Sequence, residues 1–214
     1  LVALSAIVSM GSPAHAGELW TVRSGETTIH FNVELLHDLG IDLEITGAGT
    51  AHVEGLPIEE PYWTFPILPG SDLRFRTEHD IVLPEGSTGG GMRLGGAIVL
   101  RDRATGKETR FDELEIAHVP ATGAGLQGAR RAAPLHLRSA GTKLVLCELR
   151  SSMYDFRRRP GLEVHYMNAY FTESWALAIG RPELAGWAVG LGEMRAHGER
   201  LSAMPSVGPA RARF

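Results

Sequence analysis

The residues of this chain that could do chemistry are nine histidines, one cysteine and several acidic pairs. Metal sites built from such residues use short, recognisable spacings such as CxxC or HxxxH. Here the histidines are scattered singly, and Cys147 has no second cysteine with which to pair. The sequence therefore predicts no metal site, and it predicts that Cys147 is a buried, inert thiol.

The motifs of nucleophilic and phosphate chemistry are also missing from the sequence. There is no GxSxG turn, and the run Gly89–Gly91 lacks the Lys-Ser/Thr that completes a phosphate-binding loop, so it is interpreted as a hairpin connection. Acidic pairs such as Glu59-Glu60 and Asp112-Glu113 resemble solvated strand faces rather than the spaced carboxylates of a glycosidase. We predict no catalytic residues and no enzyme activity.

Two aromatic segments are the best candidates for ligand binding. Tyr62 and Trp63 begin a YWTFP run, and a strand of period two points them to opposite faces. In HYMNAYF the same period places His165 with Met167 on one face, and the two tyrosines on the other. Tyrosine and histidine on a sheet face can bind a flat apolar ligand such as haem, whereas the alternative is core and edge packing. The predicted ligand-binding residues are Tyr62, Trp63, His165, Tyr166 and Tyr170.

The elements that must position these residues are strands. Apolar residues alternate at a spacing of two over most of the chain, and Gly- and Pro-containing turns separate the segments. No βαβ rhythm is present. The pattern predicts an all-β fold, an antiparallel two-sheet β-sandwich (Ig-like or an open barrel). The expected strands cover residues 20–22, 28–33, 43–53, 62–68, 72–76, 93–101, 109–119, 134–139, 143–150, 164–171 and 187–196.

Two short helices interrupt this pattern. Asn32 is placed to cap a helix over 33–39, and Thr172 to cap one over 173–179. Gly40 and Gly180 follow them at the position where helices commonly stop. Each helix is expected to close an edge or an end of the sandwich.

The ends of the chain differ in character from its middle. Residues 1–16 combine a short apolar run with Ala-His-Ala, which is typical of a signal peptide with its start truncated. We expect a single β-sandwich domain over 17–201 and a flexible tail over 202–214, in a secreted or periplasmic protein. No segment has the length of a transmembrane helix, one cysteine excludes an intrachain disulfide, and no basic patch with interleaved aromatics favours nucleic acid.

The order of several motifs resembles that of a family of secreted bacterial β-sandwich proteins and is similar to the HtaA-type domain of bacterial surface haem-uptake proteins. The motifs are Leu39-Gly40, Phe65-Pro66-Ile67 with Gly70, Gly95-Gly96, Phe111 to Ile116, and Gly180 to Gly186. The resemblance implies a sandwich and a haem ligand. Relatives often carry His or Tyr before the paired glycines, whereas this chain has Met92-Arg93-Leu94, so no haem ligand can be matched residue by residue.

A second likeness covers residues 20–31, which are similar to the start of periplasmic YceI-type lipid-binding proteins. Together these features favour an exported, non-catalytic binding or structural module of the bacterial envelope or cell surface. The alternative is a carrier of haem, lipid or another apolar small ligand. Its partner is accordingly an unidentified protein or a small apolar molecule, and a hydrolase would need an acid, a base and a nucleophile that the sequence does not present.

Overall fold

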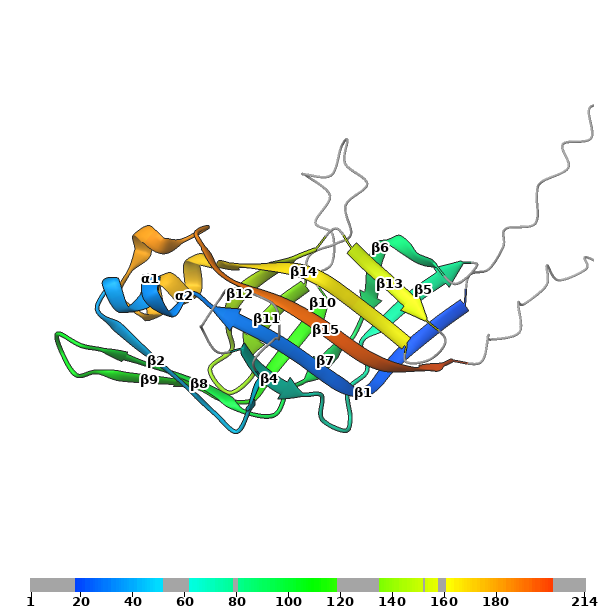
Figure 1. Ribbon diagram of the computed structural model, residues 1–214, viewed down its shortest axis with the longest axis horizontal. Coiled ribbons are helices and arrows are strands. Elements are labelled where there is room, and N and C mark those ends of the chain that lie inside the picture. The colour runs from blue at the N-terminus through cyan, green and yellow to red at the C-terminus, as the bar shows by residue number, and fades with distance from the viewer. Residues whose placement is uncertain are drawn as a thin grey trace, which may run out of the picture.

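Long antiparallel strands dominate the molecule, as the alternating pattern predicts (Figure 1). The computed structural model describes residues 18–51, 62–78, 81–118, 135–151, 153–157 and 161–201. The predicted leader over 1–16 and tail over 202–214 lie outside the described residues.

The described residues form fifteen strands, two α-helices and one 3-10 helix. The strands are β1 (Glu18–Phe31), β2 (Ile41–Thr46), β3 (Gly49–Ala51), β4 (Tyr62–Pro66), β5 (Arg74–Glu78), β6 (Ile81–Gly89), β7 (Gly91–Arg93), β8 (Ala97–Asp102), β9 (Glu108–Phe111), β10 (Leu114–His118), β11 (Leu135–Ser139), β12 (Leu144–Arg150), β13 (Met153–Arg157), β14 (Gly161–Phe171) and β15 (Ala188–Arg200). The helices are α1 (Val33–Asp38), α2 (Glu173–Ala178) and η1 (Pro182–Leu184).

Twelve strands belong to one large sheet. Nine of them lie side by side in the order β3-β4-β1-β15-β14-β12-β11-β10-β7, and every pairing among them is antiparallel. The other three join this path from the side, because β5 pairs with β1 and β6, and β13 pairs with β14. A second sheet has the order β2-β8-β9. The prediction of an all-β antiparallel fold with two sheets and two short helices is confirmed.

The large sheet curls until its two sides meet. The Ile67 amide donates to the Gly25 carbonyl of β1 at 2.9 Å, and Ile67 also forms a bridge with Leu94, which follows β7. The Gly95 amide completes the contact by donating to the Pro66 carbonyl at 2.8 Å. The segment after β4 therefore joins the β7 side of the sheet to the β1 side, and the apolar face is enclosed.

The core inside this curl is aromatic and aliphatic. Phe31, Phe65 and Phe75 have at most 1% of their surface exposed. Cys147 is also buried, and burial raises the pKa of its thiol, because a thiolate is poorly solvated there. The thiol is therefore uncharged and packed, as the sequence predicts.

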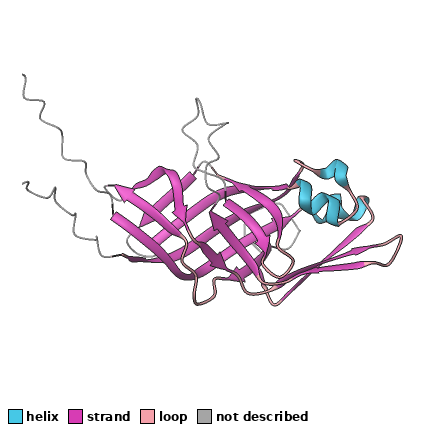
Figure 2. Ribbon diagram, turned by 180° about the vertical axis from the view of Figure 1, so that it is seen from behind, coloured by secondary structure: helices cyan, strands magenta, loops and turns pink. Residues whose placement is uncertain are grey.

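Both helices lie at one end of the molecule, beside the small sheet (Figure 2). Among the described residues, no helix has the length and apolar character that crossing a membrane requires.

Candidate functional site

The two helices at this end begin and stop where the sequence predicts. The Asn32 side chain accepts the Leu35 amide at 2.9 Å, and the Thr172 hydroxyl accepts the Trp175 amide at 3.2 Å. Gly40 and Gly180 have φ values of 76° and 75°, which glycine adopts without steric cost. Each helix is therefore a short connection between two strands, with a defined first and last residue.

The side chain of Trp175 joins α2 to the small sheet. It is fully buried, its ring centroid lies 4.5 Å from that of Phe171, and it meets Phe111 of β9 edge-on at 6.1 Å. These rings fill the space between the first turn of α2 and the small sheet. The last turn of α2 instead lines a pocket.

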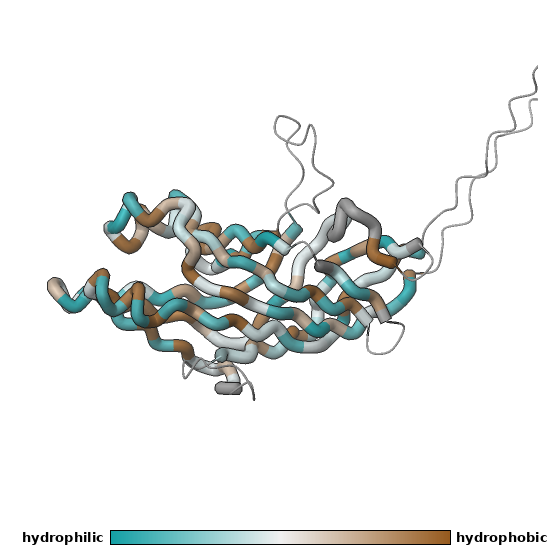
Figure 3. The backbone as a smooth tube through the Cα atoms, turned by 45° about the horizontal axis from the view of Figure 1, so that its top comes forward, coloured by the Kyte–Doolittle hydropathy of each residue, from teal (hydrophilic) through white to brown (hydrophobic). Residues whose placement is uncertain are grey.

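A pocket of about 220 Å³ lies between the last turn of α2 and the small sheet. Figure 3 shows the helices and the tip of the β8–β9 hairpin as two projections at this end of the molecule. The apolar lining consists of Ile41, Leu100, Leu177, Ala178 and Ile179, and the polar lining includes Asp102, Thr105, Lys107 and Thr109. Leu177 is 59% exposed, which is high for a leucine beside an apolar wall.

The strand register explains why the pocket wall formed by the small sheet contains both apolar and polar residues. Leu100 of β8 pairs with Leu43 of β2 on one side and with Thr109 of β9 on the other. Directly opposed residues of antiparallel strands share a face. The row that faces α2 is therefore apolar at its centre and becomes polar toward the tip of the hairpin.

The acidic group of the rim, Asp102, is engaged in a turn. Its Oδ1 accepts the amides of Ala104 and Thr105 at 2.9 and 2.8 Å and the Thr105 hydroxyl at 3.0 Å. The hydrogen bond from the Thr105 amide is the main cause that lowers the pKa of Asp102. Asp102 thus remains ionised and shapes the tip of the hairpin.

Two basic residues, Arg181 and Lys107, belong to this region of the molecule. Arg181 donates to the Leu39 carbonyl at 2.7 Å, and its charge contributes to the lowered pKa of Asp102. Lys107 is exposed, and its ammonium forms no ion pair with the part of the chain that the structure describes. The mouth of the pocket therefore carries one cation without a fixed partner.

The aromatic residues predicted from sequence lie elsewhere, on the large sheet. On β4, Tyr62 is buried with its ring centroid 5.0 Å from His30, whereas Trp63 is half-buried and lies 5.9 Å from Phe31. His30 and Phe31 are consecutive residues of β1 and point to opposite faces. Tyr62 and Trp63 therefore face opposite ways, as the period of two predicts.

A β-bulge reshapes the second aromatic segment. Val164 pairs with Met194 and Met167 with Gly192, so that two residues, His165 and Tyr166, stand opposite a single residue of β15. Val164 and Met167 are both buried, and Tyr166 is 61% exposed at a φ of 51°. The prediction that His165 and Met167 share a face is wrong, because the bulge inserts one residue between them.

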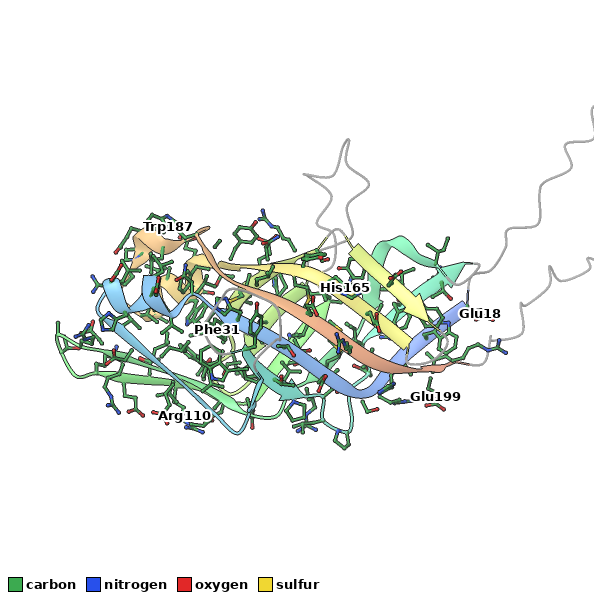
Figure 4. All side chains as sticks on the ribbon, viewed as in Figure 1. Glu18, Phe31, Arg110, His165, Trp187 and Glu199 are labelled. Carbon is green, nitrogen blue, oxygen red and sulfur yellow. The ribbon has the colours of Figure 1, made fainter. Side chains whose placement is uncertain are left out.

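Acidic side chains surround the bulge. The Nε2 atom of His165 lies 3.5 Å from a Glu163 carboxylate oxygen, and its Nδ1 atom lies 3.9 Å from one of Glu193. The rings of His165 and Tyr166 are 6.4 Å apart. Figure 4 places His165 in the middle part of the sheet, away from Trp187 beside the helices.

Tyr170 lies farther along β14, where the Arg150 guanidinium stacks over its ring at 4.9 Å. Strands β1 and β15 separate it from Tyr62, which amounts to about 14 Å at about 4.8 Å per strand. The structure thus brings His165 together with Tyr166, and it does not gather the five predicted residues around one cavity.

The pocket residues were not identified from the sequence. The walls of the pocket come from β2, the β8–β9 hairpin and α2, which are far apart in the chain. One local signal was available: Leu177 follows the buried Trp175 by two positions, which places it on the opposite side of a helix. A large apolar residue on the side of α2 opposite the core is a reason to expect that this side of the helix also contacts an apolar group.

Comparison with known proteins gives a distant likeness. The chain matches no protein-family model, and no curated protein matches it in sequence. The C-terminal domain of HtaA from Corynebacterium glutamicum aligns over 84% of this chain and 99% of its own, with a TM-score of 0.46 and 11% identity. The heme binding protein HtaB of the same organism aligns over 85% of this chain and 96% of its own, with a TM-score of 0.39 and 10% identity. The chain is distantly similar in structure to both.

The residues of the pocket do not fit haem. Haem iron is held by His, Cys, Met or Tyr, and none of these lines the pocket. Among the described residues, no group of three or more His, Cys, Asp or Glu is arranged to hold a metal ion. Tyr166 offers an exposed phenol, but Glu163 and Glu193, which lie beside the neighbouring His165, are unfavourable for the haem propionates.

Proposed function

We propose that this protein is a non-catalytic binding protein that holds a small apolar molecule in the pocket between α2 and the small sheet. The observation that carries this proposal is the apolar wall of the pocket facing an exposed leucine, Leu177. The leader pattern at residues 1–16 supports the further proposal that the protein acts outside the cytoplasm, in the envelope or at the cell surface.

The size of the pocket sets the expected affinity. A volume of 220 Å³ corresponds to about seven groups of the size of a water molecule, at about 30 Å³ each. Burying a chain of about six methylene groups is favourable by about 5 kcal/mol. That corresponds to a Kd on the order of 0.1 to 1 mM. Binding should therefore be measured by a method that detects weak complexes.

A titration with hexanol, followed by two-dimensional NMR of the labelled protein, tests this function. We expect saturable shifts of the amide signals of Leu100, Leu177 and Ile179. The variant Leu177→Gln should bind hexanol about fivefold more weakly, because the ligand loses one buried aliphatic partner. Ile81→Gln is the matched control, since Ile81 is 67% exposed and does not line the pocket. Shifts spread over the whole sheet, or equal affinities in the two variants, would contradict the proposal.

A second candidate is a haem contact at Tyr166, which one observation favours. The bulge turns this tyrosine into solvent beside a histidine, and phenolate is a known haem-iron ligand. A haemin titration should then give a saturable Soret shift that is lost in Tyr166→Phe. Tyr170→Phe, on the same strand, shows whether the aromatic face contributes as a whole. A nonspecific response, or the same shift in wild type and Tyr166→Phe, removes this candidate.

A further inference from the structure

We propose that the pocket at α2 selects a short aliphatic carboxylate, with the carboxylate held by Lys107 at the mouth and the chain lying against Leu177 and Ile179. This inference rests on the proposed function, because it names the class of ligand for the same pocket. It also departs from haem, which the distantly similar heme binding protein HtaB binds.

The shape of the lining favours an aliphatic chain over a planar ring system. The apolar side chains of the pocket are aliphatic, and none of its lining residues is aromatic. The rings of Phe111, Phe171 and Trp175 are buried, and the exposed ring of Trp187 is not among the lining residues. A flat macrocycle therefore finds no ring to stack on within the pocket. At 220 Å³ the pocket is also below the range of about 300 to 1,000 Å³ typical of larger ligands.

The charge at the mouth favours an anionic head group. Asp102 is the acidic residue of the lining, and its Oδ1 is already satisfied by the Thr105 turn. Arg181 lies close enough to influence Asp102, but it is bound to the Leu39 carbonyl. Asp102 and Lys107 are the two charged residues of the lining, and Lys107 is the one that forms no ion pair with the residues that the structure describes.

The position of Lys107 suits this role. It lies in the short turn of the β8–β9 hairpin, where its own amide donates to the Thr105 hydroxyl at 3.2 Å, which fixes its backbone. Thr109 lines the pocket two residues later, and its side chain offers a second polar group for the head group. The ligand would thus be oriented with its polar end outward and its chain toward α2.

The test compares hexanoate with hexanol on the same protein by NMR titration. We expect hexanoate to bind about three- to fivefold more tightly, as is typical of one exposed charge pair, and the preference to shrink as salt is added. In Lys107→Gln the preference for hexanoate over hexanol should be lost, so that the two ligands bind the variant equally. Lys143→Gln, which removes the other lysine of the chain outside the pocket, should keep the preference.

The outcomes separate the two proposals. If neither ligand shifts the pocket amides, the proposed function fails and this inference fails with it. If hexanol and hexanoate bind the wild type equally, or if Lys107→Gln keeps the preference, the carboxylate inference is overturned and the apolar binding function stands. If haemin displaces hexanoate from the pocket with higher affinity, the ligand class proposed here is wrong. The amide signals of the large sheet, far from the pocket, show whether Lys107→Gln is folded.

Discussion

Tyr166 combines two properties that rarely meet in a strand, a left-handed backbone and an exposed aromatic ring. A bulky residue at positive φ is strained, by about 1 to 2 kcal/mol. The strain is retained because the bulge is fixed on both sides: buried Val164 and Met167 hold the register, and the Ser151 hydroxyl donates to the His165 carbonyl. Such sites are frequent where a side chain is used for recognition.

This strain can be measured. In Tyr166→Asn the backbone conformation is tolerated better and no buried contact is lost, so we expect the free energy of unfolding to rise by about 0.5 to 1 kcal/mol. Urea denaturation gives this value. Tyr170→Asn is the control, because Tyr170 is half-buried under Arg150 and should be destabilised by the same replacement. A stability loss in Tyr166→Asn would show that the ring makes contacts that outweigh the strain.

At the residue scale, the sequence predicted side-chain direction well wherever the strand was regular. The opposite orientation of Tyr62 and Trp63 follows from the period of two. The orientation of His165 does not, because a bulge depends on the partner strand. Nothing in the sequence around Tyr166 reveals that β15 offers one residue opposite two.

At the scale of elements, α2 is attached to the large sheet through its capping residue. The Thr172 hydroxyl accepts the Trp175 amide and also contacts the carbonyls of Val145 and Leu146 on β12. Ser174 adds a hydrogen bond to the Val145 carbonyl at 2.8 Å. The cap therefore does more than begin a helix, since it holds one wall of the pocket against the sheet.

Replacing this cap should show both roles. We expect Thr172→Ala to lower the free energy of unfolding by about 1 to 3 kcal/mol, because it removes a helix cap and leaves strand carbonyls with fewer donors. Asn32→Ala, which removes only the cap of α1, should cost about 1 kcal/mol. The two values come from urea denaturation monitored by circular dichroism, and equal losses would mean that the link to β12 contributes nothing.

Elements determined by local interactions were predictable, and those determined by pairing were not. Both helices, with their caps and terminal glycines, follow from residues within one turn of each other. Strands β6 and β13 were not expected, and Gly89–Gly91 was interpreted as a hairpin connection. In the structure this run separates β6, which pairs with β5, from β7, which pairs with β10. That β6 and β7 pair with different strands depends on contacts between residues far apart in the sequence.

At the scale of the whole molecule, the pocket exists because the small sheet is separate from the large one and lies beside the helices (Figure 2). Its walls extend from Ile41 to Gly180, so no window of sequence contains the site. The sequence predicted the two-sheet, antiparallel class correctly, because the class depends on alternation and turn residues. The site could not be predicted, because it depends on how separate elements meet.

The pairing of the first strand with the last governs when this protein can fold. Strands β1 and β15 pair from Trp20↔Arg200 to Phe31↔Gly190, and Arg200 and Glu18, 182 residues apart, form an ion pair at 2.7 Å. At synthesis rates of about 5 to 20 residues per second, about 10 to 40 s pass between the appearance of these two residues. Throughout that interval one side of β1 lacks its partner, and closing so long a loop is slow. The nascent chain therefore cannot complete its large sheet until β15 has been made.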